Sequence, residues 1–276
     1  MIHDVVHLKE YFPQLGENGC DPTLTVYSLQ NLSAMGRQNI LRPTILICPG
    51  GGYRDVSQRE SEPIAMQFTA KGYNVLVLSY SCAPNRFPTQ LREVAAAMEL
   101  IHSNAEIWHC DPERVAILGF SAGGHLAGHY STCFDCAEVR ELFPQSKAVK
   151  ASVLCYPVIT GYPPHRHLGS FANLTGHEEP TEEDMAKFSL ENQVTEKTPP
   201  TFLWHTAEDK GVPPMNSLLY AQALAENKVP FTIHVYPFGV HGLSTVDEQT
   251  LNEVTDKTRL AGGWIDELLK WLKFTL

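Results

Sequence analysis

Short apolar runs alternate with longer amphipathic stretches along most of the chain. The apolar runs predict buried strands and cover residues 44–50, 73–80, 114–120, 149–158, 201–207 and 231–238. The amphipathic stretches predict helices and cover residues 61–73, 89–106, 122–131, 216–228 and 264–274. Strands that are apolar throughout need cover on both faces. The pattern therefore predicts an α/β fold with a mostly parallel central sheet and helices on both faces.

The first of these helices carries its own boundary signals. Ser61 is placed to cap its N-terminus, Pro63 suits the first turn, and Gly72 follows its end. Two regions depart from the alternation. Residues 1–40 hold one weaker strand, "TLTVYSL", which we expect at an antiparallel edge. Residues 159–197 are rich in Pro, Gly, His and Glu, and we expect a cap-like insertion within one domain that spans residues 1–276.

Composition narrows the classes of partner. The formal net charge is -10, which argues against a nucleic-acid partner, since phosphate binding needs clustered Lys and Arg. No apolar run is long enough to span a bilayer, and the first residues do not read as a secretion signal. The chain has seven cysteines, an odd number, and they are scattered along it. This pattern fits reduced thiols better than a framework of disulfides. We therefore expect a cytoplasmic protein without a membrane partner, and the sequence leaves a homo-oligomer open.

Candidate chemistry begins at Ser121, in the sequence "LGFSAGGHLAG". Gly119, Ser121 and Gly123 form a G-x-S-x-G pattern between a predicted strand and a predicted helix. In that context the serine is held in a sharp turn that presents its hydroxyl, and the small neighbours let the two backbones pass closely. A turn serine that merely caps a helix is the alternative. The strand–turn–helix context favours a nucleophile.

A serine hydroxyl needs a base, and the base needs a carboxylate. His241 follows the last predicted strand in a loop flanked by glycines, where it can reach Ser121. The loop after the preceding strand offers Glu208 and Asp209. We prefer Asp209, which lies farther from the strand and next to the turn at Gly211. The chain order Ser, Asp, His agrees with the order expected for a triad on this kind of sheet.

The developing negative oxygen of an acyl-transfer reaction needs backbone N–H donors. The amide of Ala122, directly after the nucleophile, is one candidate. The motif "CPGGGY" follows an early strand, and three consecutive glycines allow amides to approach a ligand without side chains in the way. We assign Gly51 and Gly52 to this oxyanion hole and keep Gly50 as an alternative.

Most of the remaining histidines and cysteines have simpler interpretations. We expect His125 to pack on its helix, His205 to be a satisfied core residue, and His165 and His167 to be solvated. The "CFDC" motif at residues 133–136 is a single pair of cysteines and is weak support for a metal site. The sequence therefore predicts neither a metal nor an organic cofactor.

Together, the motifs "CPGGGY", "GFSAGGHLAG", "PPTFLWHTAEDKGVPPMNSLLYAQAL" and "YPFGVHGLS" resemble the α/β-hydrolase superfamily over residues 20–275. Within it the chain resembles the bacterial acetyl esterases often called xylan esterases or sugar hydrolases. The resemblance places the nucleophile, acid and base on Ser121, Asp209 and His241. Pro49 stands where many related lipases and esterases have a histidine, so the comparison with that wider group is weaker.

The resemblance implies a serine carboxylesterase that removes acetyl groups, and sometimes feruloyl groups, from hydroxylated carbohydrates. Tyr53 and Tyr156 are candidates for contact with such a small-molecule substrate, as is the "GYPPHRH" start of the insertion, whereas we expect Trp204 in the core. A peptidase or amidase on the same fold would use the same triad. A lipase would need an apolar lid, and a non-catalytic binding protein would have a broken triad.

Overall fold

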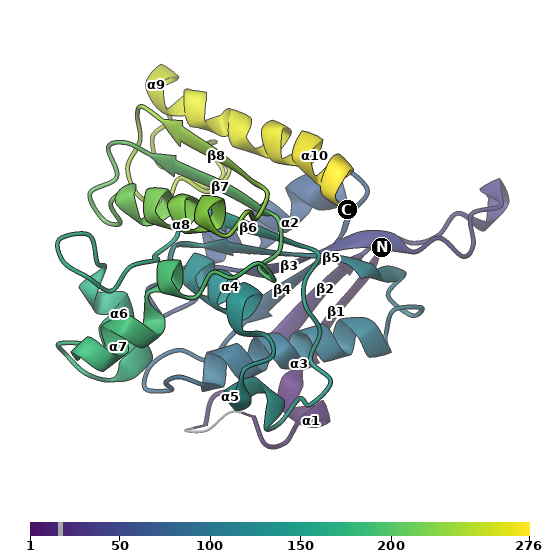
Figure 1. Ribbon diagram of the computed structural model, residues 1–276. Helices are drawn as coiled ribbons and strands as arrows, with labels where there is room; N and C mark the ends of the chain where they lie inside the picture. The colour runs from purple at the N-terminus through teal and green to yellow at the C-terminus, as the bar shows by residue number, and fades with distance from the viewer. Residues whose placement is uncertain (16–18) are drawn as a thin grey trace.

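The computed structural model describes residues 1–15 and 19–276 of the 276-residue chain (Figure 1). In these residues, eight strands form one sheet in the order β1-β2-β4-β3-β5-β6-β7-β8. The strands are β1 (Ile2–His7), β2 (Thr23–Ser28), β3 (Arg42–Cys48), β4 (Asn74–Ser79), β5 (Cys110–Phe120), β6 (Ala151–Cys155), β7 (Thr201–Thr206) and β8 (Phe231–Tyr236). The six strands from β3 to β8 run parallel, as the alternating pattern predicts.

Helices connect these strands and cover the sheet. The helices are α1 (Leu8–Tyr11), α2 (Glu62–Thr69), α3 (Thr89–Ser103), α4 (Ser121–Cys133), α5 (Ala137–Arg140), α6 (Leu168–Thr175), α7 (Glu182–Phe188), α8 (Met215–Glu226), α9 (Asp256–Arg259) and α10 (Trp264–Thr275). Within the described residues, none of them is long and apolar enough to cross a membrane.

The expected edge strand is an inner strand. The "TLTVYSL" segment forms β2, which is antiparallel as predicted but pairs with β1 on one side and with β4 on the other. The edge position belongs to β1, which the sequence analysis missed. Its sequence "IHDVVH" leaves most side chains at least partly exposed and buries Val6, so its apolar signal is weak.

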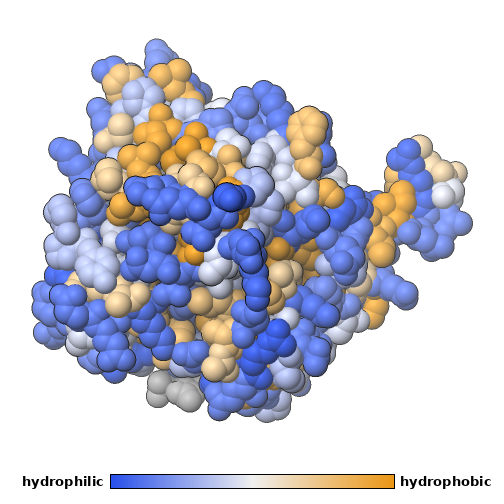
Figure 2. Space-filling view, in the orientation of Figure 1, coloured by the Kyte–Doolittle hydropathy of each residue, from blue (hydrophilic) through white to orange (hydrophobic). Residues whose placement is uncertain are grey.

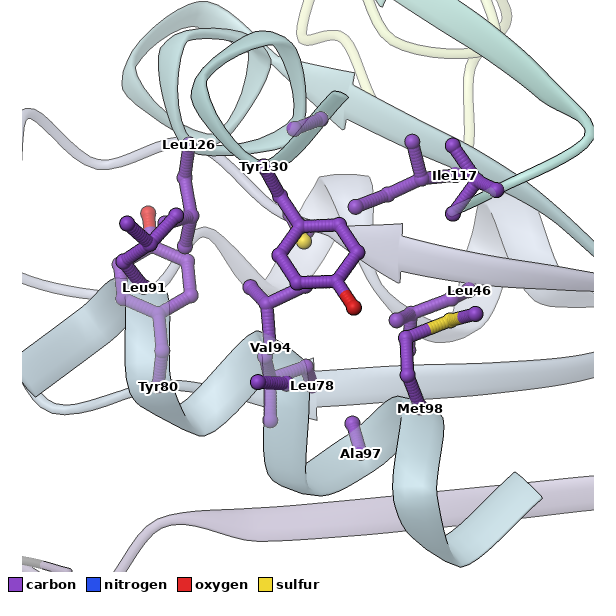
Figure 3. Packing of buried hydrophobic residues seen from close by; sticks show 14 of the residues in the cluster. Leu46, Leu78, Tyr80, Leu91, Val94, Ala97, Met98, Ile117, Leu126 and Tyr130 are labelled. Atoms are coloured by element: carbon purple, nitrogen blue, oxygen red, sulfur yellow. The ribbon is translucent and has the colours of Figure 1, made fainter. Parts of the chain in front are cut away.

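The inner strands contribute side chains alternately to two hydrophobic cores, one on each face of the sheet. In β3, Leu46 belongs to the core under α3, α4 and α8, and Ile45 and Ile47 belong to the core under α2 and α10. Figure 3 shows the first core, where side chains of α3 and α4 such as Val94 and Tyr130 meet those of the strands. This double cover explains why the central strands are apolar throughout.

Two local predictions need correction. Ser61 precedes α2, but within the described chain its side chain does not cap the helix, because its hydroxyl donates instead to the carbonyl of Ser57. The strand predicted over residues 149–158 is shorter, since Tyr156 turns the chain with a φ of 38° directly after β6. Pro63 and Gly72 lie where the sequence places them, in the first turn of α2 and after its end.

One connection projects from the body of the molecule. Residues 29–41 join β2 to β3 and reach outward as an arm (Figure 1). Its apolar side chains include Leu32 and Met35, which are exposed, and the arm shows apolar and polar patches in Figure 2.

The carboxyl ends of the parallel strands lie at one edge of the sheet, where ligands bind in such folds. The loops after β3, β5, β7 and β8 carry the candidate residues. Residues 159–197 follow β6 and hold α6 and α7 before the chain returns to β7. Its placement between two neighbouring strands brings this insertion to the same edge.

Candidate active site

Ser121 lies at a sharp turn between β5 and α4. Its φ is 53°, a left-handed conformation that non-glycine residues adopt at a cost of about 1–3 kcal/mol and that clusters at functional sites. A Cβ atom on Gly123 would lie 2.1 Å from the carbonyl oxygen of Cys48, and one on Gly119 would lie 2.1 Å from the carbonyl oxygen of Gly123. The glycines around Ser121 are therefore required by close backbone contacts, as the sequence predicts.

The structure brings Ser121, His241 and Asp209 together. The Nε2 atom of His241 lies 2.8 Å from the Oγ atom of Ser121, and its Nδ1 atom lies 2.7 Å from Oδ2 of Asp209. Ser121 is 8% exposed, and the His241 side chain is 27% exposed. A substrate can thus approach a serine that is otherwise enclosed, and a base lies within hydrogen-bond distance of its hydroxyl.

Asp209 is buried and well supplied with donors. Its Oδ1 atom accepts the amides of Gly211 and Val212, both at 2.9 Å, and Nε2 of His205 lies 3.3 Å from its Oδ2 atom. Burial raises the pKa of Asp209, but the hydrogen bonds from His205 and His241 outweigh it and hold the pKa well below its usual range. The carboxyl group is therefore ionised at neutral pH and faces the imidazole of His241.

Glu208, the alternative acid, points elsewhere. Its side chain is exposed, and its Oε2 atom accepts the amide of Gly239 at 3.2 Å. His241 is hydrogen-bonded to Asp209 instead. The geometry therefore favours Asp209 over Glu208 as the partner of the base.

The three glycines after β3, residues 50–52, form a glycine loop that offers free amides beside the nucleophile. The N–H of Gly50 already donates to Oε2 of Glu60 at 2.8 Å, which removes this residue from the candidates. The amides of Gly51 and Gly52 have no acceptor among the described residues. Ala122 lies in the first turn of α4, where N–H groups lack an intrahelical acceptor. Gly51 must be glycine, since a Cβ atom there would lie 2.0 Å from the carbonyl oxygen of Asp55.

The two tyrosines proposed for substrate contact lie in the interior. Tyr53 is 1% exposed, and its hydroxyl lies 2.8 Å from Nδ1 of His125. Tyr156 is 2% exposed, and its hydroxyl donates to Oε1 of Glu60 at 2.7 Å. A buried ring has no free face, so neither residue can stack on a sugar in this structure. Trp204 is buried as expected and stacks on Trp264.

The other histidines divide into interior and insertion residues. His205 is buried and hydrogen-bonded, as predicted. His125, expected to pack on its helix, is buried and hydrogen-bonded to Tyr53 and Phe188, and burial lowers its pKa to about 4. His165 and His167, expected to be solvated, are half-buried, because the insertion folds back on the body. The Nδ1 atom of His167 accepts the amide of Ser170. Burial and the nearby His241 lower the pKa of His167.

No candidate metal centre is found in the part of the chain that the structure describes. There, no three His, Cys, Asp or Glu side chains are grouped as metal ligands. Cys133 ends α4 and Cys136 precedes α5, and the cysteines of the described chain are free thiols.

The insertion contacts the glycine loop directly. The side-chain amide of Asn173, on α6, donates to the carbonyl oxygen of Gly52 at 2.9 Å. The hydroxyl of Ser170 lies against Gly52, where it would be 3.8 Å from a Cβ atom. Sequence reasoning missed Asn173 and also Glu60. Neither lies in a motif. Glu60 stands in a polar stretch that is typical of an exposed loop, and Asn173 lies in the insertion, which the sequence does not link to the glycine loop.

Comparison with known proteins identifies the family. The sequence profile described as BD-FAE matches residues 32–224. The chain belongs to the BD-FAE family. The matched range contains Ser121, Asp209 and the glycine loop and ends before His241.

Two curated relatives of this BD-FAE chain have names that refer to xylan. Endo-1,4-beta-xylanase B of Butyrivibrio fibrisolvens is 37% identical over 232 residues, which are 80% of this chain and 36% of that protein. An acetylxylan esterase of Xylanibacter ruminicola is 30% identical over 198 residues, which are 70% of this chain and 39% of that protein. The chain therefore spans less than two fifths of the length of these relatives.

A solved structure matches over nearly the whole chain. The acetyl ester-xyloside bifunctional hydrolase of Caldicellulosiruptor lactoaceticus is 34% identical, with a TM-score of 0.78, and the match covers 96% of both chains. The predicted α/β-hydrolase fold is thereby confirmed. The acetylxylan esterase and this hydrolase are, by their names, carboxylic ester hydrolases to which the chain is similar.

Proposed function

We propose that the chain is a serine esterase that hydrolyses short-chain, acetyl-type esters of hydroxylated carbohydrates. The observation that carries the proposal is the hydrogen-bonded row from Ser121 through His241 to Asp209. The names of the relatives, an acetylxylan esterase and an acetyl ester-xyloside hydrolase, support the choice of acyl group and of carbohydrate.

The reaction proceeds in two acyl transfers. His241 takes the proton of Ser121 as its Oγ attacks the ester carbonyl, and the carbonyl oxygen becomes an oxyanion. The bond to the sugar oxygen then breaks, and His241 gives that oxygen the proton. Water, activated by His241, attacks the acyl-serine and releases the acid. Asp209 keeps the proton of His241 on Nδ1, so that Nε2 is free to act as the base.

The oxyanion would be held by backbone amides. Gly51, Gly52 and Ala122 carry the candidate N–H groups. Each N–H group that donates a hydrogen bond to the oxyanion stabilises the transition state by about 3 kcal/mol. The candidate donors belong to a loop that Glu60 anchors at Gly50 and to the N-terminus of α4. They therefore need little reorganisation when the charge develops.

The insertion supplies a candidate for contact with the alcohol part of the substrate. Nδ1 of His167 accepts the Ser170 amide, so the neutral ring carries its proton on Nε2, which has no partner among the described residues. This N–H donor belongs to the segment that contacts the glycine loop. We assign it to a hydroxyl or ring oxygen of the sugar.

Two measurements test the proposal. Ser121→Ala should abolish hydrolysis of p-nitrophenyl acetate in a folded protein, and retained turnover would remove Ser121 as the nucleophile. His167→Ala should raise KM for acetylated xylo-oligosaccharides and leave KM for p-nitrophenyl acetate unchanged, because the small ester does not reach the sugar site. An equal change for both substrates would show that His167 does not contact the sugar.

A panel of substrates separates the alternatives. Short acetyl esters should be turned over faster than long-chain esters, which would be preferred by a lipase. The matching amides should show no turnover, whereas a peptidase or amidase would hydrolyse them as well as the esters. A protein that binds a fluorophosphonate at Ser121 but hydrolyses none of the acetylated sugars would contradict the assignment of carbohydrate.

A further inference from the structure

Glu60 is a buried carboxylate that joins two loops of the candidate active site. Its side chain is 3% exposed, and each of its oxygens accepts a hydrogen bond. The Oε2 atom accepts the amide of Gly50 at 2.8 Å, and the Oε1 atom accepts the hydroxyl of Tyr156 at 2.7 Å. Gly50 directly precedes the two glycines with free amides. Glu60 therefore holds the start of the glycine loop from the interior.

The hydrogen bond between Glu60 and Tyr156 connects Glu60 to the loop that carries His241. The Tyr156 hydroxyl accepts the amide of Ser244 at 3.0 Å, three residues after His241. The Tyr156 ring also packs edge-to-face against the His241 ring, with centroids 5.2 Å apart. In addition, the Ser244 hydroxyl donates to the carbonyl oxygen of Arg59, next to Glu60. The segment Arg59–Glu60 thus contacts both the glycine loop and the loop that carries His241.

The residues held in this way are conformationally strained. Tyr156 has a φ of 38° and Ser244 has a φ of 51°, both in the left-handed region. Such residues keep their conformation only when surrounding contacts fix it. The hydrogen bonds that the Tyr156 hydroxyl donates to Glu60 and accepts from the Ser244 amide are contacts of this kind.

We infer that Glu60 is a positioning residue, which sets the free amides of the glycine loop and the imidazole of His241 at their distances from Ser121. The inference rests on the proposed acyl-transfer function. A preorganised site needs its donors fixed before the charge develops, and a displacement of about 1 Å lowers the rate about 100-fold. Both neighbours donate to Glu60. A glutamine that keeps its oxygen on the Gly50 amide would turn its N–H₂ group toward the Tyr156 hydroxyl, whose own proton would then lose its acceptor.

The test compares variants of equal size at two buried carboxylates. Glu60→Gln should lower kcat for p-nitrophenyl acetate about 100-fold per titrated active site and leave KM within about threefold. The matched control is Glu93→Gln. Glu93 is also buried and accepts the Ser81 amide, but it lies outside the contacts described above. This variant should change the thermal midpoint and leave kcat within about twofold.

Two further readouts separate positioning from simple stability. A trifluoromethyl ketone forms an oxyanion adduct with the serine, so its inhibition constant should rise for Glu60→Gln in parallel with the loss of kcat/KM. Tyr156→Phe removes one hydroxyl and should lower kcat about tenfold, and it also decides the case if Glu60→Gln does not fold. Unchanged kcat per site in Glu60→Gln, or in Tyr156→Phe where only that variant folds, would overturn the inference.

The proposed function and this inference can fail separately. If wild-type protein does not hydrolyse the acetate ester, the proposed function fails. The rate of fluorophosphonate labelling then still reports on Glu60, because it needs only the nucleophile, the base and the oxyanion donors. Slower labelling of Glu60→Gln than of Glu93→Gln supports the positioning role, and equal rates refute it.

Discussion

Replacement of Asp209 by asparagine tests the triad most directly. In the native protein Oδ1 accepts two backbone amides, and Oδ2 faces His241. An asparagine that keeps its oxygen on the two amides must turn its N–H₂ group toward Nδ1 of His241. That nitrogen then becomes an acceptor, and the ring proton moves to Nε2, where it blocks the transfer from Ser121. The opposite orientation would set a donor against the amides of Gly211 and Val212.

The expected loss is large because the variant stabilises the wrong tautomer and also loses the charge that faces the imidazolium. For a triad of this kind the loss is about 10⁴-fold in kcat. At about 1.4 kcal/mol for each factor of ten, it corresponds to about 5.5 kcal/mol of transition-state stabilisation. A loss of this size cannot be explained by a small displacement of the His241 loop.

The assay is the hydrolysis of p-nitrophenyl acetate at neutral pH, with active sites counted by fluorophosphonate labelling. Glu208→Gln is the matched control. It changes the neighbouring acid, which is exposed, and should alter kcat less than about threefold. A retained activity above about one tenth in Asp209→Asn, or an equal loss in Glu208→Gln, would refute the assignment of the acid.

Three further predictions concern packing, pH and the insertion. Gly123→Ala should destabilise the fold by about 3 kcal/mol in a denaturant titration, because the new Cβ would lie 2.1 Å from the carbonyl oxygen of Cys48. Burial raises the pKa of Glu93 to about 7, so the folded state keeps a proton that the unfolded chain loses above about pH 4.5. The contribution of Glu93 to stability should be fullest below that pH and be lost as the pH rises through about 7, and Glu93→Gln should flatten the pH dependence of the thermal midpoint over this window. Asn173→Ala should lower kcat about tenfold for every ester, because the Gly52 carbonyl loses its partner.

Each of these predictions has an outcome that contradicts it. Gly263→Ala is the control for Gly123→Ala, since a Cβ atom there would meet nothing within 4 Å, and equal stability of both variants would discount the close contact. If the thermal midpoint of Glu93→Gln depends on pH as that of the wild type does, the loss of stability near pH 7 belongs to another group. An Asn173→Ala enzyme that changes KM for sugars alone would show that the residue serves substrate binding.

The sequence predicts the residues in the loops that directly follow strands and misses residues elsewhere in the connections. Ser121 and His241 follow apolar runs, and parallel strands end at one edge, so their meeting can be inferred from the pattern. Glu60 could not be found in this way. It stands in the polar stretch "SQRESEP", and its burial depends on Tyr156, which is distant in the sequence. The outer strand β1 was missed for a similar reason, since an edge strand with one exposed face carries a weak apolar signal.

The insertion between β6 and β7 has a consequence for how this enzyme family can diversify. A loop that only faced the substrate could be exchanged freely between homologues, and the chemistry would be unaffected. Here the same segment carries Asn173, which is bonded to the Gly52 carbonyl. Under the proposed function, a change of the insertion that alters selectivity should therefore also alter turnover. A chimera that takes its insertion from another esterase should retain its rate only when the graft restores a donor at that position.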